Sequence, residues 1–357
     1  MIPVTKSFLP PIDVYTEYLK KAWDKKMITN RGDLVVELEN KLKTCFDLSH
    51  LLCTNNGTIP IQIALKLFAK GGEVITTPFS YVATTAAIKW ENCTPVFVDI
   101  DPNYWTIDET KIEDAITEKT TCILATHVFG NPCNIDAIDK IAKRYNLKVI
   151  YDAAHCFGVD YNGQSIFNYG DISTCSFHAT KIFHTAEGGA LICNNKEKND
   201  EVFALHNFGH KGKLEFSGLG INAKMSELSA AMGLSILPNM SSIFEKRKKI
   251  VDYYNQNLNF KGFNTFKLRE NSNSNYSYYP IVFDSKINRE KAEYQLKSKN
   301  IVPRRYFFPS LNQLPYITDV SMPISESISE SILCIPLYHS LSNKEQLLVV
   351  NTLNSLN

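Results

Sequence analysis

The stretch SFHATKIFHTAEGGALIC, residues 176–193, predicts how the large part of the chain folds. It holds Lys181 between an apolar run that ends near residue 177 and a second run, GGALIC, that begins at residue 188. Because too few residues separate the two runs for a helical crossover, one of the two strands should run antiparallel. Lys181 would then lie just past a strand end. The alternative is a lysine on a solvated face. The polar residues around it are Ser176, His178, Thr180, His184 and Glu187.

The chain before this stretch alternates short apolar runs with segments of helical periodicity. That order predicts a parallel sheet with helices on both faces, and near-continuous apolar runs fit strands buried on both sides. With the antiparallel strand added, the predicted fold class is α/β with a mixed, mostly parallel sheet. The runs are HLLCT (50–54), EVITT (73–77), TPVFVDI (94–100), CILATHVF (122–129) and LKVIYDAA (147–154), each predicted to precede a helix.

Length and pattern predict two domains. The chain has 357 residues, of which 44% are hydrophobic, enough for one large core and a smaller one. A charged helix over 243–258 should lead into the second core, so we expect a large domain over 1–240, including the N-terminal segment, and a small α+β domain over 241–357. The polar stretch RENSNSNYS, 269–277, is expected to be a connection.

Composition excludes several classes of partner. The 38 basic and 37 acidic residues nearly cancel, and no Lys/Arg block could track phosphates, so we expect no nucleic acid partner. The nine cysteines form no C-x-x-C pair, which predicts reduced, buried thiols with no disulfide and no metal site. Neither a charged leader nor an apolar stretch of about 18 residues is present, so we expect no membrane contact and a cytoplasmic location.

Polar residues follow several of the apolar runs, where open α/β sheets bind ligands. Asn56, Gly57 and Thr58 open a helix after the first run, as either an ordinary N-cap or an anion site. Asp152 and His155 follow the run that ends at residue 151, as either a paired carboxylate and its neighbour or a helix cap and a core histidine. The chain lacks the P-loop and dinucleotide fingerprints.

A helix start, a strand-end carboxylate and a loop lysine together suit pyridoxal phosphate. The phosphate would take the helix N-terminus, Asp152 would keep the pyridine nitrogen protonated, and Lys181 would form the Schiff base. Partial desolvation would lower the pKa of such a lysine and make its amine nucleophilic. Tyr81, in PFSYVATT (78–85), could stack on the ring.

These residues resemble the DegT/StrS family of sugar-nucleotide aminotransferases, which are fold type I enzymes that use pyridoxal phosphate. The resemblance runs nearly end to end and is most specific at the Ser-Phe-His-x-x-Lys segment followed by Glu-Gly-Gly, in which His178 and Glu187 match without an assigned role. The other matching segments are NNGTIPIQIAL (55–65), DAAHCFG (152–158) and GINAKMSELSAAMGL (220–234).

The resemblance implies roles for the three residues we take as catalytic. Lys181 would hold the cofactor and move protons, Asp152 would pair with the pyridine nitrogen, and His155 would lie beside the phenolic oxygen of the ring. Tyr81 would stack on the ring.

The resemblance also implies how the phosphate is held. Gly57, Thr58 and Ser176 would bind it, and Asn222 would reach it from a second subunit, so we expect a homodimer with shared active sites.

The sequence departs from the family pattern at two positions. Asn56 stands where serine is common, and Lys224 where arginine is common, which weakens the expectation for each. In the family, the regions matching 29–32 and 303–309 approach the sugar nucleotide. Diphosphate contact and a plain solvated charge remain equal alternatives for the arginines of the second region, Arg304 and Arg305.

The implied activity is transfer of an amino group from L-glutamate to a nucleotide-linked keto sugar. Members that aminate C4 often have histidine at the position of His155, whereas C3-aminating members usually have glutamine. The resemblance therefore favours dTDP-4-keto-6-deoxy-D-glucose as substrate and dTDP-4-amino-4,6-dideoxy-D-glucose as product, for O-antigen or another surface polysaccharide. Alternatives are a C3 aminotransferase, or a dehydratase of the same family, which carries histidine in place of the lysine. A non-catalytic regulator would need an added recognition module, and a Rossmann oxidoreductase would need the missing glycine fingerprint.

Overall fold

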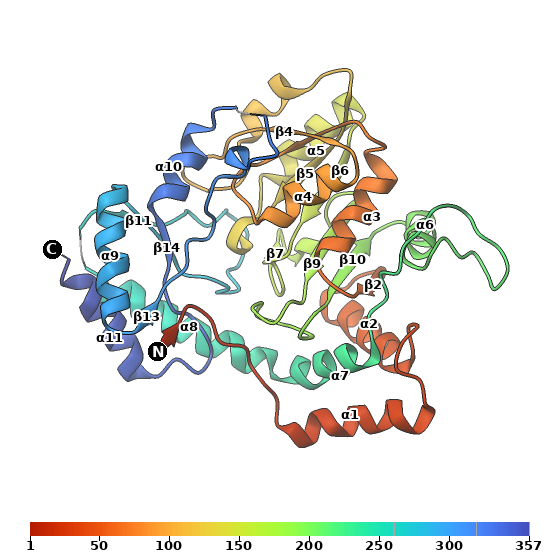
Figure 1. Cartoon of the computed structure of the whole chain (residues 1–357), viewed down its shortest axis with the longest axis horizontal. Helices are drawn as coiled ribbons and strands as arrows, with labels where there is room; N and C mark the ends of the chain where they lie inside the picture. The colour runs from red at the N-terminus through yellow and green to blue at the C-terminus, as the bar shows by residue number, and fades with distance from the viewer. Residues whose placement is uncertain (260, 319, 357) are drawn as a thin grey trace.

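The structure is a computed structural model and describes residues 1–259, 261–318 and 320–356. Its main sheet has the order β2-β10-β9-β6-β5-β3-β4 (Figure 1). All neighbours in it are parallel except β10, which runs antiparallel to both β2 and β9. The predicted mixed sheet is confirmed, and its antiparallel strand is the one that returns from the Lys181 loop. The strands are β2 (His50–Thr54), β3 (Glu73–Thr76), β4 (Thr94–Phe97), β5 (Thr120–Thr126), β6 (Lys148–Asp152), β9 (Ile172–Ser176) and β10 (Gly189–Cys193).

Helices cover both faces of this sheet, as the alternating pattern predicts. The apolar faces of α3, α4 and α6 form one core with one side of the sheet. Those of α2, α5 and α7 form the other core on the opposite side. The helices are α2 (Asp33–Phe46), α3 (Thr58–Phe68), α4 (Val82–Trp90), α5 (Ile135–Tyr145), α6 (Lys196–His206) and α7 (Glu227–Ile236).

Two of the predicted helices are wrong. After β4 the chain forms only the short 3₁₀ turns Glu109–Lys111 and Glu113–Ala115. After β6 it forms turns and a hairpin, β7 (Asp160–Tyr161) and β8 (Gln164–Ser165). An Asn-Gly pair between β7 and β8 takes positive φ at both residues, the backbone that a tight hairpin turn requires, so local turn chemistry overrides the helical pattern there.

Helix α8 (Met240–Asn257) continues on from α7 beneath the main sheet (Figure 1). The residues after α8 form a second, smaller part of the fold, which we call the small layer. Its antiparallel sheet has the order β11-β12-β14 and packs against helices. The strands are β11 (Phe263–Asn264), β12 (Pro280–Phe283) and β14 (Ile332–Cys334), and the helices are α9 (Lys286–Ser298), α10 (Pro323–Ser331) and α11 (Asn343–Asn354).

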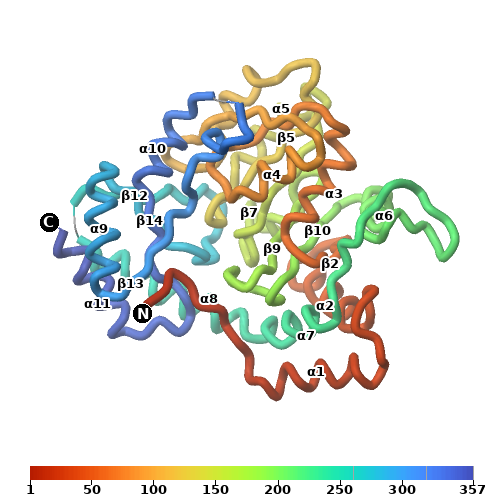
Figure 2. The backbone as a smooth tube through the Cα atoms, viewed as in Figure 1, coloured from red at the N-terminus to blue at the C-terminus, as the bar shows by residue number. Residues whose placement is uncertain are grey.

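The N-terminal segment joins the two parts. Strand β1 (Ile2–Pro3) pairs in parallel with β13 (Ile301–Val302) beside the small sheet. Figure 2 shows the chain then crossing to α1 (Ile12–Lys25), which packs on α7. The start of α8 coincides with the expected boundary at residue 240. The division into domains 1–240 and 241–357 stays a prediction. With that boundary, β1 of the first domain would pair with β13 of the second.

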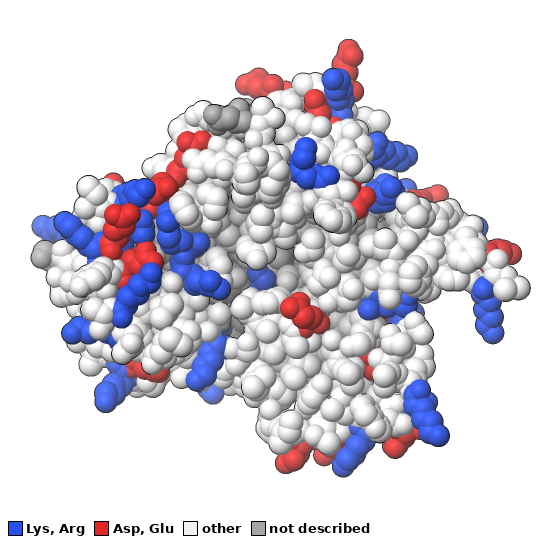
Figure 3. Space-filling model, in the orientation of Figure 1, with Lys and Arg blue, Asp and Glu red and all other residues white. Residues whose placement is uncertain are grey.

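The composition predicts the mixed charges of the surface and the burial of most of the cysteines. Basic and acidic residues are interspersed on the face shown in Figure 3, and the centre of that face is largely uncharged. Cys45 is exposed, against the expectation of burial, and the other cysteines are buried. Along the described ranges, no helix is both long enough and apolar enough to cross a membrane.

Glu227 ties two helices together. It opens α7, yet its buried carboxylate accepts hydrogen bonds from the backbone N–H groups of Leu34 (2.8 Å) and Val35 (3.1 Å) at the start of α2. A helix N-terminus leaves such donors without partners and favours a negative charge. The acidic residue of the segment 220–234 is therefore a helix cap in this fold.

Replacing Glu227 with alanine should lower the free energy of unfolding by about 1–3 kcal/mol, because two buried donors lose their acceptor. Urea unfolding measures this loss. Glu227→Gln keeps one acceptor oxygen and should lose less. Glu37→Ala, which breaks a partly exposed pair with Lys41, is the control and should stay within about 0.5 kcal/mol of wild type. Equal losses in the two alanine variants would contradict the capping role.

Candidate active site

The carboxyl ends of neighbouring strands bring the predicted polar residues to one edge of the main sheet. Asp152 ends β6 and pairs in register with Thr126 of β5 and Thr174 of β9. Ser176 ends β9. His155, Ser176 and Lys181 line one hollow at this edge, together with Tyr278 of the small layer. His155 and Lys181, two of the three residues predicted to be catalytic, line this hollow, and the third, Asp152, is close enough to Lys181 for their charges to interact.

Asp152 is a buried carboxylate with two hydrogen-bond donors. The Thr84 hydroxyl donates to Oδ2 at 2.8 Å and the Ala154 backbone N–H donates to Oδ1 at 3.2 Å. Burial raises the pKa of Asp152, and the two hydrogen bonds together with the charge of Lys181 oppose that rise without cancelling it. Residues 153–158 form turns, so Asp152 is not a helix cap.

Thr84 was not predicted as a site residue. It comes from α4, and its hydroxyl also contacts Ser80 Oγ at 2.8 Å, which in turn accepts from Thr126 Oγ1 at 3.2 Å. The threonines that follow Tyr81 in the segment 78–85 are the signal in the sequence for buried hydroxyl donors.

His155 is buried in an aromatic cluster. Its ring lies nearly parallel to those of Phe307 (centroids 5.7 Å apart) and Phe129 (6.2 Å). The Phe129 backbone N–H donates to Nδ1 at 3.1 Å, which places the proton of the neutral imidazole on Nε2. Burial holds the pKa of His155 well below its usual range, so the ring is neutral.

Lys181 lies in the loop between β9 and β10. Backbone hydrogen bonds from Phe177 to Gly188 (2.8 Å) and from Thr185 to Phe177 (2.9 Å) close the base of this loop. The Lys181 amine donates to the Tyr278 hydroxyl at 3.4 Å. Burial lowers the pKa of Lys181, and the charge of Asp152 is the largest opposing influence. The solvated alternative is therefore wrong for this lysine.

The N-terminal segment holds the Lys181 loop from outside. Ser7 Oγ donates to the Ala179 carbonyl at 2.5 Å, and His184 Nε2 bonds the Phe8 carbonyl at 2.8 Å. His184 thus has a structural role.

His178 and Glu187 form an exposed group on the same loop. His178 Nδ1 bonds Thr180 Oγ1 at 2.8 Å, and His178 Nε2 lies 3.6 Å from Glu187.

The start of α3 lies against this edge and is partly capped. The Asn56 carboxamide oxygen accepts from the backbone N–H groups of Thr58 (2.9 Å) and Ile59 (3.0 Å), so this side chain caps the helix start from the residue before Gly57, the N-cap. Gly57 faces Ser176, because a Cβ at Gly57 would lie 2.6 Å from the Cβ of that serine. A Cβ at Gly189 would lie 2.4 Å from the Asn56 carbonyl oxygen. These two glycines allow the start of α3 to lie close to the end of β9 and the start of β10.

Tyr81 and Asn222 are less enclosed. Tyr81 is the N-cap of α4, is 57% exposed, and lies near enough to Lys181 for the two groups to interact electrostatically. Asn222 is exposed and pairs with Asn207 by a backbone bridge. The next residue, Ala223, accepts a hydrogen bond from the backbone of Asn55 at 2.8 Å. Within the described residues, Asn222 forms no hydrogen bond with the residues of its own chain that are predicted to be catalytic.

Lys224, which departs from the family pattern, and the two arginines with open roles lie in different surroundings. Lys224 Nζ donates to Asn207 at 2.9 Å. Arg305 donates to the Ser329 carbonyl at 2.9 Å and pairs with Glu330 at 3.4 Å, so it is tied to the end of α10. Arg304 is exposed, with its guanidinium 5.7 Å from the Tyr306 ring.

The segment 269–277 does more than connect. Asn275 Nδ2 donates to the carbonyl groups of His155 (2.7 Å) and Phe157 (2.9 Å), and Ser277 Oγ donates to the His155 carbonyl at 3.1 Å. The segment forms a wall of the site. Its side chains meet residues more than a hundred positions away, so no local pattern revealed them.

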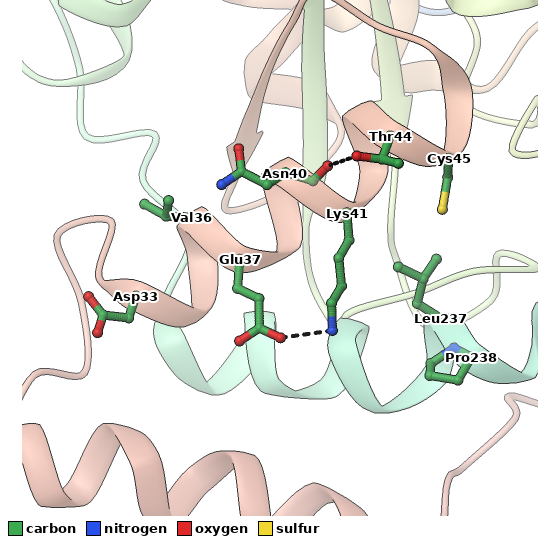
Figure 4. Close-up of a pocket in the computed structure, with 9 residues that line it drawn as sticks. All are labelled: Asp33, Val36, Glu37, Asn40, Lys41, Thr44, Cys45, Leu237 and Pro238. Atoms are coloured by element: carbon green, nitrogen blue, oxygen red, sulfur yellow. Dashed lines mark hydrogen bonds and ion pairs between the residues drawn. The ribbon is translucent and has the colours of Figure 1, made fainter.

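A second hollow lies between α2 and the 3₁₀ turn η5 (Leu237–Asn239), which follows α7 (Figure 4). The Glu37–Lys41 ion pair, 2.8 Å long, crosses it, and Leu237 and Pro238 form its far side. Its lining contains none of the predicted site residues. The strand-end hollow is therefore the candidate active site.

Comparison with known proteins agrees with this fold and shows the family of the chain. The model of the DegT/DnrJ/EryC1/StrS aminotransferase family matches residues 13–354. The chain is 39% identical over 360 residues to the dTDP-4-amino-4,6-dideoxy-D-glucose transaminase of Shigella dysenteriae, covering 99% of the chain and 98% of the relative. It is 40% identical over 356 residues to the Escherichia coli transaminase of the same name, covering 96% and 95%. The crystal structure of DesI in the presence of its TDP-sugar product matches with a TM-score of 0.93 at 29% identity, covering 99% and 92%.

The fold and site thus define an aminotransferase that uses pyridoxal phosphate. The chain belongs to the DegT/DnrJ/EryC1/StrS aminotransferase family.

The residues at the strand ends fit this cofactor. A glycine cradle beside Ser176, a buried carboxylate and a desolvated amine supply the groups that a phosphate, a pyridine nitrogen and an aldehyde need.

Asp152→Asn should leave the cofactor-free protein at least as stable as wild type near neutral pH. Because burial raises the pKa of Asp152 above its unfolded value, the folded state binds the extra proton, and stability falls as pH rises through the folded pKa. The neutral amide of asparagine avoids the free-energy cost of burying an ionised carboxylate. Thermal melts should therefore converge at acid pH and separate in favour of the variant at pH 7. The exposed Asp160→Asn is the control, and a variant less stable than wild type at pH 7 would contradict the prediction.

Proposed function

We propose that this enzyme transfers the amino group of L-glutamate to C4 of dTDP-4-keto-6-deoxy-D-glucose and yields dTDP-4-amino-4,6-dideoxy-D-glucose. The observation that carries the amino-transfer chemistry is the half-buried Lys181 amine, which lines one hollow with His155 and Ser176 and has a pKa lowered by burial near Asp152. Two end-to-end relatives, 39% and 40% identical, bear the name of the transaminase of this sugar, which supports the C4 position and the nucleotide. The histidine at residue 155 also supports amination at C4.

The proposed roles follow from the environment of each side chain. When bound, pyridoxal phosphate supplies an aldehyde and an electron sink. Lys181 would attach to the aldehyde, and its amine, when released, would accept a proton and pass it on. The lowered pKa of Lys181 favours the neutral amine that can accept that proton. Asp152 holds a proton at the pyridine nitrogen, so Asp152→Asn is expected to lose about 10²-fold or more in turnover. His155, with its proton on Nε2, orients the ring oxygen, and Tyr81 covers the ring face.

The phosphate site would combine Gly57, Thr58 and Ser176. Since Asn56 already takes the N–H groups of Thr58 and Ile59, its carboxamide would have to turn away if those groups are to bind the phosphate.

A homodimer is supported by the exposed loop between α6 and α7, which projects from the body in Figures 1 and 2. Large apolar side chains on this loop are exposed, a feature typical of interaction surfaces. Asn222 lies at its end and would reach the phosphate of the partner subunit. The exposed apolar residues are Phe208, Leu214, Phe216, Leu219 and Ile221.

We also propose that the product serves O-antigen or other surface polysaccharide synthesis. A cytoplasmic location is supported by cysteines that are unpaired in the structure, as is typical of a reducing compartment.

Lys181 is predicted to be the residue that carries the cofactor. Borohydride reduction followed by peptide mapping should place the pyridoxyl group on Lys181, and Lys181→Ala should reduce turnover by at least about 10²-fold. Lys224→Ala is the control for a second lysine of lowered pKa and should still carry the label at position 181. The label on another lysine would contradict the assignment.

Shared active sites can be tested by mixing two inactive variants, Lys181→Ala and Asn222→Asp. If Asn222 serves the neighbouring subunit, a heterodimer has one site with both lesions and one intact site. Random mixing should then restore about a quarter of wild-type activity. No recovery after demonstrated subunit exchange would place Asn222 in the site of its own chain or remove it from the site.

The substrate is tested by incubation with glutamate and a panel of dTDP-, UDP- and GDP-linked keto sugars, with NMR of the product. We expect turnover of dTDP-4-keto-6-deoxy-D-glucose and a new amino group on C4. Amination at C3, or turnover only of a UDP or GDP sugar, would overturn the proposed substrate.

A further inference from the structure

The Tyr278 hydroxyl is a polar contact of the Lys181 amine that comes from the small layer. The two atoms are 3.4 Å apart, and the Tyr278 ring packs on His155 with centroids 4.9 Å apart. Burial raises the pKa of the Tyr278 phenol, so the hydroxyl keeps its proton at neutral pH. It can accept a hydrogen bond from a charged lysine or donate one to a neutral lysine.

A buried arginine fixes the backbone just before Tyr278. Arg247 of α8 is 5% exposed, and its Nε and Nη2 donate to the carbonyl groups of Tyr276 (2.7 Å) and Ser277 (2.5 Å). Throughout the described ranges, no carboxylate forms an ion pair with it. Burial lowers the pKa of Arg247 to about 10, so it is still charged at neutral pH. A buried cation is costly unless its N–H groups are satisfied, and two of them are satisfied by these carbonyls.

The same short segment is held from its other side by the main sheet. Asn275 and Ser277 donate to the carbonyl of His155, the residue that Tyr278 packs on. Residues 275–278 are thus clamped between α8 and the turn that follows β6. The clamp leaves the Tyr278 side chain pointing at Lys181.

We propose that Tyr278 is a positioning residue for the Lys181 amine, and that Arg247 holds Tyr278 in place through the carbonyl groups of Tyr276 and Ser277. This inference rests on the proposed function, in which the released amine of Lys181 carries a proton. A lysine side chain has four rotatable bonds, and proton transfer needs its amine within a narrow range of positions. A hydroxyl on a rigid ring restricts that range.

The first test measures the lysine in the cofactor-free protein. Trace acetylation at a series of pH values, followed by mass spectrometry of the Lys181 peptide, gives the pKa of that amine. Tyr278→Phe removes an acceptor whose bond is stronger with the ammonium than with the neutral amine, so it should lower the pKa of Lys181 by roughly 0.5 to 1. Tyr279→Phe is the matched control. It removes a hydroxyl that bonds Asn255 at 2.7 Å and should leave the profile of Lys181 unchanged.

The second test measures the reaction with glutamate in single-turnover experiments. Tyr278→Phe should slow it about 10-fold to 10²-fold, with the KM for glutamate and the cofactor Kd changed less than about 2-fold. The primary isotope effect with α-deuterated glutamate should rise, because proton transfer becomes more rate-limiting. A purely structural role would not raise that isotope effect.

Arg247→Lys tests the second half of the proposal. Lysine keeps the charge but lacks the planar guanidinium group that donates to two carbonyls. Arg247→Lys should therefore lower the pKa of Lys181 and slow the reaction with glutamate, as Tyr278→Phe does. If that variant does not fold, Arg247→Gln replaces it.

Tyr278→Phe behaving as Tyr279→Phe does in both tests would overturn the role of Tyr278. A folded Arg247 variant with wild-type behaviour would overturn the role of Arg247. The acetylation test uses neither glutamate nor sugar, so it can fail or succeed independently of the proposed function.

Discussion

The ending of β6 and β9 at one edge of the main sheet, which places Asp152 near the Lys181 loop, is the constraint on which the candidate site depends. Burial disfavours the charge on both groups, lowering the pKa of the amine and raising that of the carboxyl, while each charge partly offsets the shift of the other. Such a pair keeps its position only where the surrounding fold fixes both groups. The parallel strands supply this by ending β6 and β9 at the same edge, and the antiparallel return of β10 limits the lysine to a short loop.

Three distant parts of the chain converge on that edge. The N-terminal segment bonds the Lys181 loop through Ser7 and Phe8, and the helix start at Asn56 packs behind it. The segment before β12 closes the remaining side through Asn275. Another contact between the layers lies at Asp99, whose carboxylate accepts from the backbone of α10 at 2.9 Å. The small layer therefore contributes to the candidate active site, and movement between the layers would change the surroundings of Lys181.

The sequence predicts the parts of this arrangement that depend on chain order. Alternation of apolar runs and helices predicts the parallel sheet, and the short interval around Lys181 predicts the antiparallel strand. Asp152 and Lys181 follow because polar residues after buried strands must meet at one edge. Thr84 and Tyr278 were not predicted, because each acts across a tertiary contact that leaves no periodic signal. The helix expected after β6 failed because an Asn-Gly turn outweighed weak helical periodicity. Asn56 shows that a cap and an anion site have the same local pattern.

The most direct measurement of the central claim is the pKa of the Lys181 amine in the cofactor-free protein, by NMR with ¹³C-labelled lysine, in wild type and in Asp152→Asn. The account predicts a value below the ordinary 10.5 in wild type, because burial outweighs the carboxylate. It predicts a lower value still in Asp152→Asn, because the main opposing charge is gone. A wild-type pKa at or above 10.5, or a value that Asp152→Asn leaves unchanged, would contradict the account.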